Sequence, residues 1–208
     1  MDVATPKQQW FDGSFYYNFI SPFSEVLFSK IINLIPAGSK VVDFGCGAGY
    51  LGIKHHYHFS QFLGLDLSTK NIDFANNKKK QLNLTNIDFR FADATKILDI
   101  PNDFDFAITS YVVHEMPEEF RLPYTSNMIK HSKQQIIMDY SKPVKLNLAG
   151  LGVYAIEFAA GRRHFANFRN YQKNTDIKDL IEKSNGKIRK IFNFMESSMT
   201  VWYSERQF

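Results

Sequence analysis

Short apolar runs and longer stretches with helical spacing alternate along most of the chain. The runs are rich in β-branched and aromatic residues, and they predict buried strands at residues 41–44, 62–65, 87–91, 104–110 and 135–140. The stretches between them have the length and polarity of surface helices, as at residues 68–82. This alternation predicts an α/β fold with a mainly parallel sheet and helices on both of its faces. In such folds, ligands bind at the carboxyl ends of the strands.

The two ends of the chain follow different patterns. Residues 10–20 form an aromatic run with neither a helical nor a strand period, so this N-terminal arm must pack on another part of the protein. Apolar residues at helical spacing up to Ile35 then predict a helix that Pro36 ends. Arm and helix together make up residues 1–36. The chain closes with a predicted helix at 176–183 and with predicted strands at 188–194 and 199–203.

The segment from residue 146 to residue 173 is longer than the single crossover helix that a parallel sheet requires. Apolar residues at helical spacing from Leu148 to Phe158 predict one helix, and a second helical piece carries Arg162, Arg163 and Arg169. Because this insertion follows the fifth strand, we expect it to form a mobile helical lid over residues 110–115.

Three glycines at alternate positions mark the most informative stretch. Gly45, Gly47 and Gly49 follow the strand at 41–44 directly, and glycine lets the backbone turn tightly and come close to a ligand. Asp43 lies at the end of that strand, and a second acidic residue, Asp66, closes the next apolar run. The two carboxylates decide which cofactor the loop can bind.

The loop also matches the G-x-G-x-x-G pattern through residues 47–52, which is the pattern of an NAD-binding oxidoreductase. In that fold the loop holds an anionic pyrophosphate, which a carboxylate at the Asp43 position would repel. S-adenosylmethionine has no phosphate and carries a sulfonium and an α-ammonium group, and its ribose still needs an acceptor such as Asp66. The sequence therefore favours S-adenosyl-L-methionine as the cofactor.

Three motifs give the chain its resemblance to the class I S-adenosylmethionine-dependent methyltransferases. They are residues 43–49, 64–68 and 91–94, whose order and spacing match the first three motifs of that family. The resemblance implies a Rossmann-like seven-stranded sheet with an antiparallel C-terminal strand, in a single domain spanning residues 1–208. Later features are similar to the small-molecule branch of the family, which includes methyltransferases of quinone biosynthesis.

The resemblance also implies which residues contact the cofactor. Tyr17 of the N-terminal arm would approach its methionine end, Asp93 would contact the adenine amine, and Ala94 would supply a backbone N–H. The predicted cofactor-binding residues are Tyr17, Asp43, Gly45, Cys46, Gly47, Gly49, Asp66, Leu67, Asp93, Ala94 and Ser110.

Methyl transfer needs few catalytic residues, because the protein must chiefly hold the acceptor atom in line with the methyl group and exclude water. If the acceptor is a phenol or another hydroxyl, a general base helps, and the ordinary pKa of histidine suits that task. His114, after the fourth strand, and His164, in the predicted lid, are the candidates. A packing role is the alternative for each. We expect a small aromatic or amphipathic acceptor.

Two nucleic-acid chemistries are excluded. The Asp/Asn-Pro-Pro-aromatic motif of DNA adenine methyltransferases is absent after the fourth strand. Cytosine-C5 methylation needs a nucleophilic cysteine in that region, whereas the only cysteine, Cys46, lies in the glycine loop. RNA methylation stays open through the basic clusters at 78–80 and 162–173, and a non-catalytic cofactor-binding module is a further alternative.

Composition narrows the class of protein further. A chain of 208 residues with 44% hydrophobic residues can bury one full core. No apolar run approaches the roughly 18 to 20 residues of a membrane span, and the N-terminus lacks the order of a signal peptide, so we expect a cytoplasmic protein without membrane insertion. The 25 basic and 21 acidic residues nearly balance, which gives little support to a nucleic-acid partner.

The sequence predicts no metal site. His55, His56 and His58 lie close together in the chain, but three imidazoles on so short a segment cannot all converge without an unusual turn. No acidic or cysteine residue lies near them in the sequence. We therefore expect these three histidines to lie at the surface.

Overall fold

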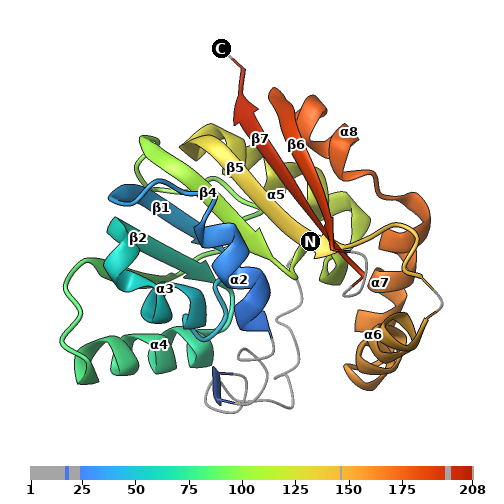
Figure 1. Ribbon diagram of the computed structural model, residues 1–208, viewed down its shortest axis with the longest axis horizontal. Coiled ribbons are helices and arrows are strands. Elements are labelled where there is room, and N and C mark those ends of the chain that lie inside the picture. Colours follow the sequence, from blue (N-terminus) through green and yellow to red (C-terminus); the bar gives the residue numbers. More distant parts are fainter. Residues whose placement is uncertain (1–16, 19–23, 146, 195–197, 208) are drawn as a thin grey trace. The chain divides into compact units, whose positions relative to one another are not determined.

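The computed structural model describes residues 17–18, 24–145, 147–194 and 198–207. The chain divides into two compact units, a first unit up to Asp93 and a second unit from Ala94 onward. Figure 1 labels the elements of both units. Most of the aromatic N-terminal run falls outside the described residues, and Tyr17 is the part of it that bears on the site.

The seven strands have the order β3-β2-β1-β4-β5-β7-β6. The pairs β1/β2, β2/β3 and β4/β5 are parallel, whereas β7 runs antiparallel to both β5 and β6. This is the predicted Rossmann-like, mainly parallel sheet with antiparallel strands at its C-terminal end. The strands are β1 (Ser39–Phe44), β2 (Phe59–Asp66), β3 (Ile87–Phe91), β4 (Phe104–Ser110), β5 (Ser132–Tyr140), β6 (Gly186–Phe194) and β7 (Met199–Arg206).

In the first unit, helices connect the parallel strands β1, β2 and β3. Ser68 begins α4, because its hydroxyl accepts a hydrogen bond from the N–H of Asn71 at 3.3 Å. Gly64 of β2 lets the Phe89 ring pack directly on the strand, since a Cβ at that glycine would lie 2.5 Å from the ring. The helical elements of this unit are α2 (Glu25–Ile32), α3 (Tyr50–Lys54), η3 (His56–His58) and α4 (Thr69–Gln81).

The prediction that the three clustered histidines lie at the surface is wrong for His55. Its side chain is buried, and its Nε2 lies 3.4 Å from a carboxylate oxygen of Glu25 on α2. The Nε2 of His58 lies 2.7 Å from the backbone oxygen of Ile35. Both histidines therefore join the η3 segment to the region of α2, and nothing in the local sequence indicates these long-range partners.

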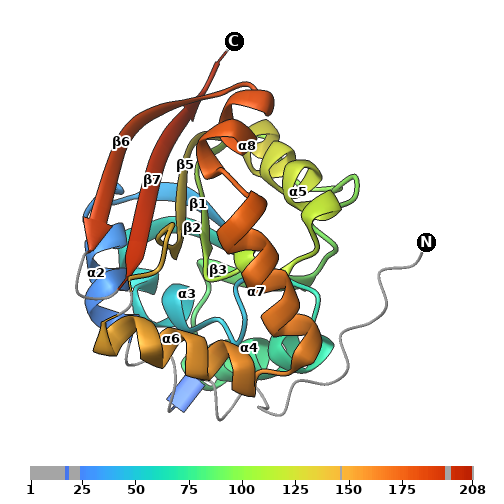
Figure 2. The same cartoon turned by 90° about the vertical axis from the view of Figure 1, so that its right-hand side faces the viewer.

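In the second unit, helices flank the strands β4, β5, β7 and β6. Its helical elements are η4 (Val113–Glu115), α5 (Glu118–His131), α6 (Leu148–Ala159), α7 (Arg162–Asn174) and α8 (Ile177–Lys183). The predicted insertion after the fifth strand thus forms two helices, α6 and α7, and Figure 2 shows α7 leading from α6 to α8.

The helix α6 buries little of its apolar surface. Leu148, Leu151 and Phe158 are 90%, 56% and 70% exposed, whereas Val153 and Glu157 are buried. An acidic residue is thus buried on a helix whose other residues are nearly all apolar. Among the described residues, no helix combines the length and the apolar character needed to cross a membrane.

Candidate active site

The loop after β1 has the backbone that its glycines allow. Gly45, Gly47 and Gly49 all have positive φ angles, of 76°, 54° and 77°. The N–H groups of Gly45 and Cys46 both donate to the backbone oxygen of Leu65, at 2.8 and 3.0 Å. The loop is therefore fixed against the end of β2. Within the part of the chain that the structure describes, a Cβ at Gly47 would meet no atom within 4 Å, so these residues leave room for a ligand beside the loop.

Asp66 closes the loop from the end of β2. Its Oδ2 accepts the N–H of Gly47 at 2.9 Å and its Oδ1 accepts the N–H of Ser68 at 2.8 Å. Burial raises the pKa of Asp66, and these backbone donors act in the opposite direction. Because Asp66 lies directly beside the glycine loop, its carboxylate is a suitable acceptor for a ligand with paired hydroxyl groups such as a ribose.

Asp43 lies at the end of β1 with only 2% of its surface exposed. Burial, followed by repulsion from Asp66, raises its pKa to about 8. Its Oδ1 accepts no hydrogen bond from the residues that the structure describes. A buried carboxylate oxygen without a donor is costly, and it suits a ligand that brings a cationic N–H group.

The other predicted cofactor residues are distributed over both units. In the first unit, the ring of Tyr17 packs 5.1 Å from the ring of Tyr50, the residue that begins α3 after the glycine loop. Leu67 is 36% exposed beside Asp66, and Asp93 lies two residues beyond β3. In the second unit, Ala94 is buried and Ser110 ends β4. Their contacts with the cofactor stay predictions.

In the second unit, His114 lies on η4 with its imidazole enclosed by carboxylates. Its Nδ1 lies 2.6 Å from Oδ1 of Asp139, and its Nε2 lies 3.5 Å from Oε1 of Glu157. Burial alone would lower the pKa of His114, but the two carboxylates outweigh burial and raise it to about 10. The two carboxylates thus favour the imidazolium form of His114, which does not suit a general base.

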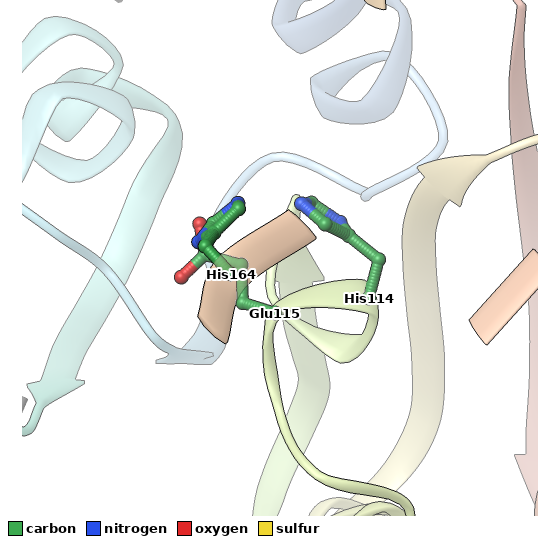
Figure 3. Close-up of side chains that lie close together, drawn as sticks. All are labelled: His114, Glu115 and His164. Atoms are coloured by element: carbon green, nitrogen blue, oxygen red, sulfur yellow. The ribbon is translucent and has the colours of Figure 1, made fainter. Parts of the chain in front are cut away.

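His164 of α7 reaches the same carboxylate from the other side. Its Nε2 lies 2.6 Å from Oε2 of Glu157, and its side chain is 16% exposed. Burial alone would raise the pKa of Glu157, but the two histidines hold it at about 2. Figure 3 shows that the His114 and His164 side chains approach each other, with the Glu115 carboxylate beside His164. The structure therefore brings the two predicted histidines together across a shared acidic group.

The helix α7 packs on η4 through a polar clamp. Asn167 donates to the backbone oxygen of Glu115 at 2.6 Å, and Arg121 of α5 donates to the backbone oxygens of Met116 and Asn167 at 2.9 and 3.1 Å. The predicted lid segment thus lies against residues 113–115. Its mobility stays a prediction.

Aromatic rings surround the histidine pair. The ring of Tyr140 lies 4.7 Å from that of His114, and the rings of Phe168 and Tyr171 lie within 6.3 Å of His114. Exposed arginines occupy the other side of α7, at positions 162, 163 and 169. The site is therefore apolar and aromatic around a small charged centre, and the basic cluster of the sequence is spread over the outer surface of α7.

Sequence reasoning missed three acidic residues of this centre. Asp139 follows the apolar run of β5, the same signal that drew attention to Asp43 and Asp66. Glu157 is the only charged residue of α6, which is a signal in itself. Glu115 follows His114 and offered no such signal, because acidic residues are common at the start of a helix.

A family model described as "Methyltransferase domain" matches residues 35–194. The chain belongs to this family. A ubiquinone biosynthesis O-methyltransferase of Pelagibacter ubique is 24% identical over 169 residues, which cover 78% of this methyltransferase and 69% of that protein. An uncharacterized protein of Rickettsia prowazekii, RP789, is 38% identical over 85 residues. The matched segment is 40% of this chain and 15% of RP789, so the chain spans a small part of that relative's length.

Solved structures share the fold of this methyltransferase. The magnesium protoporphyrin IX methyltransferase of Synechocystis with bound SAH superposes with a TM-score of 0.64 at 19% identity, covering 89% of this chain and 83% of that one. A SAM-dependent methyltransferase of Aquifex aeolicus gives a TM-score of 0.66 at 18% identity, covering 93% and 98%. Family, fold and cofactor class agree with the prediction of an S-adenosylmethionine-dependent methyltransferase.

Proposed function

We propose that this methyltransferase transfers a methyl group to a hydroxyl of a small aromatic or amphipathic acceptor. The observation that carries the proposal is the charged centre of His114, His164 and Glu157 within a ring of aromatic side chains. Aromatic rings suit the body of such an acceptor, and the charged centre suits its ionisable oxygen. The names of the Pelagibacter relative and of the Synechocystis neighbour are compatible with an acceptor of this kind.

The residues of the first unit fit S-adenosylmethionine. Oδ1 of Asp43 lacks a donor among the described residues, and the Asp66 carboxylate lies beside the glycine loop. A Cβ at Gly47 would meet no atom of the described residues within 4 Å. We infer that Asp66 accepts hydrogen bonds from the ribose hydroxyls and that Asp43 faces the α-ammonium group. When bound, the cofactor supplies an electrophilic methyl carbon. Tyr17, beside Tyr50, would cover the loop and exclude water.

Replacing Asp66 with alanine is expected to weaken cofactor binding by about one to two decades. Loss of charge-assisted hydrogen bonds costs on the order of 1.5 to 3 kcal/mol, and each 1.4 kcal/mol is about tenfold in affinity. Isothermal titration calorimetry with S-adenosylhomocysteine measures the change. Asp88→Ala, at a partly exposed carboxylate of the same unit, is the control and should bind like the unaltered protein. Equal affinity of Asp66→Ala and the control would place the ribose elsewhere.

His164 is the member of the histidine pair that an acceptor can reach, because His114 is 2% exposed. We expect His164→Asn to lower turnover by about two decades or more, the lower end of what a residue acting on the acceptor proton contributes. Cofactor affinity should stay unchanged, since His164 is not among the predicted cofactor-binding residues. His56→Asn is the matched control. Turnover of His164→Asn equal to that of the control would show that His164 does not act on the acceptor proton.

The class of the acceptor can be tested before the substrate itself is identified. The protein is incubated with methyl-labelled cofactor and, in separate reactions, with a fractionated metabolite extract and with total cellular RNA. We expect label in a small, organic-extractable product. Label in RNA, together with binding that weakens steeply as salt rises, would instead support RNA methylation.

A further inference from the structure

We propose that His114, Glu115 and His164, together with Glu157, form a binding site for a divalent transition-metal ion. The first three residues each offer a ligand atom, and these atoms all lie within 4.8 Å of one another. Figure 3 shows the three side chains turned into the same space. A single ion with bonds of about 2.0 to 2.2 Å to nitrogen and oxygen spans such separations after small side-chain rotations.

The Glu157 carboxylate supplies the second, independent observation. It lies between the two imidazoles, with Oε1 3.5 Å from Nε2 of His114 and Oε2 2.6 Å from Nε2 of His164. Oε1 accepts the hydroxyl of Tyr140 at 2.8 Å, whereas the buried Oε2 has the close ion-pair contact with His164 but receives no well-aligned hydrogen bond from the described residues. A buried carboxylate oxygen that receives no well-aligned hydrogen bond has a lone pair available to coordinate a cation.

Asp139 gives His114 the support that metal-binding histidines receive. A ligating imidazole nearly always donates its other N–H to a carboxylate, a carbonyl or water, which fixes the tautomer and directs the free nitrogen to the metal. The 2.6 Å contact of Nδ1 with Asp139 has this form, and it leaves Nε2 facing Glu157. Asp139 is itself held, because its carboxylate also accepts the backbone N–H groups of His114 and Tyr140. The orientation of the His114 ring is therefore set before any ion binds.

The charges of the centre also favour a cation. Asp139, Glu157 and Glu115 bring three carboxyl groups to two imidazoles, whereas the nearby guanidinium of Arg121 donates to backbone and uncharged side-chain oxygens. Two imidazoles with carboxylates form a mixed nitrogen and oxygen set, which suits Zn²⁺, Fe²⁺, Mn²⁺ or Co²⁺ better than Ca²⁺ or Mg²⁺. Because a metal binds a deprotonated ring nitrogen, an ion at Nε2 of His114 would displace any proton there.

The site would also give the two histidines a common task. A metal ion lowers the pKa of a coordinated hydroxyl, so an acceptor oxygen in an open coordination position would lose its proton to solvent and attack as the anion. This role rests on the proposed function, whereas ion binding does not. The ion is therefore titrated in the absence of both cofactor and acceptor.

The protein is stripped with a chelator and titrated with Co²⁺, whose visible absorption reports ligand geometry. We expect one equivalent of Co²⁺ to give a saturable band that Zn²⁺ abolishes, and a higher midpoint of thermal unfolding with either ion. His164→Ala and Glu157→Gln should lose the band, and Asp139→Asn should weaken binding by about 10-fold to 100-fold. His56→Asn is the matched control and should retain the band.

Two results would overturn the inference. The first is the absence of a stoichiometric band in the unaltered protein, which would make the centre an internal ion-pair network. The second is a band that persists in both His164→Ala and Glu157→Gln, which would place the ion elsewhere. Circular dichroism of each variant ensures that a lost band reflects lost ligands and not an unfolded chain, and His164→Ala, at a partly exposed side chain, is the variant expected to fold best. Ion binding without methyl transfer would refute the proposed function and leave the metal site intact.

Discussion

Replacing Arg121 with methionine is expected to lower the free energy of unfolding by about 3 to 5 kcal/mol, near the upper end of single-substitution effects. The Arg121 side chain is 1% exposed, and its guanidinium donates to five oxygen atoms. The acceptors are the backbone oxygens of Val113, Met116 and Asn167 and the side-chain oxygens of Asn170 and Thr175. Methionine fills much of the same volume but donates to none of them, so several buried acceptors would lose their donor.

The substitution should also loosen the candidate active site. Arg121 ties α7 to the segment that carries His114, through Asn167 on one side and Val113 and Met116 on the other. Burial lowers the pKa of Arg121, and no carboxylate is among its five acceptors, so the guanidinium is held by geometry and not by an ion pair. Without it, the bond from Asn167 to Glu115 and the ring contacts of His114 with α7 would remain between α7 and η4.

Denaturant unfolding of three variants measures this effect. Arg121→Met should show the full loss, and Arg121→Lys a partial loss, because an ammonium group keeps the charge but has three donors and no planar fork. Arg169→Met, at an exposed position of α7, should change the free energy of unfolding by less than about 0.5 kcal/mol. A loss below about 1 kcal/mol for Arg121→Met would contradict the prediction that the hydrogen bonds of Arg121 stabilise the fold.

Cofactor-free protein is expected to lose about 4 kcal/mol of stability between about pH 5 and pH 8 through Asp43 alone. The pKa of this carboxyl is raised from 3.8 to about 8 by burial and by Asp66. Because the folded value lies above the unfolded one, the contribution is fully present below about pH 4 and is lost as pH rises through about 8. The folded protein must then hold an ionised carboxylate in a buried position, whereas the unfolded chain exposes it to water.

Asp43→Asn isolates this contribution. Without cofactor, the variant should be more stable than the unaltered protein at about pH 8, and its free energy of unfolding should vary less with pH. The same substitution should weaken binding of the cationic cofactor, since an asparagine amide presents no negative charge to the α-ammonium group. Asp43 would then be a residue whose ionisation destabilises the empty protein and stabilises the complex.

Thermal unfolding at several pH values, with and without cofactor, checks both parts. Asp73→Asn, at an exposed position of α4, is the control for removal of an aspartate. Coinciding stability profiles of Asp43→Asn and the control would contradict the destabilising role of Asp43. Equal cofactor affinity of the two variants would contradict its contact with the α-ammonium group.

The sequence by itself determined the features that depend on neighbouring residues. The glycines after β1 and the acidic residue at the end of β2 predict a tight loop with a carboxylate beside it, because strand, turn and carboxylate form one local unit. Strand and helix periods likewise predict the α/β class, since they report which side of an element is apolar. The seven-stranded sheet with its antiparallel C-terminal end was predicted only together with the family resemblance.

Only the tertiary structure decided which polar residues share a buried environment. His114 and Asp139 are 25 positions apart in the sequence. Glu157 contacts His114 from α6, and the sequence of α6 predicts only an apolar helix with one charged residue. Arg121 is bound to oxygens as far away as Thr175, 54 positions along the chain. No local period encodes such contacts, because they depend on how α5, α6 and α7 pack beside β5. For the same reason His55 lies buried against Glu25, although its neighbourhood in the sequence is typical of a surface turn.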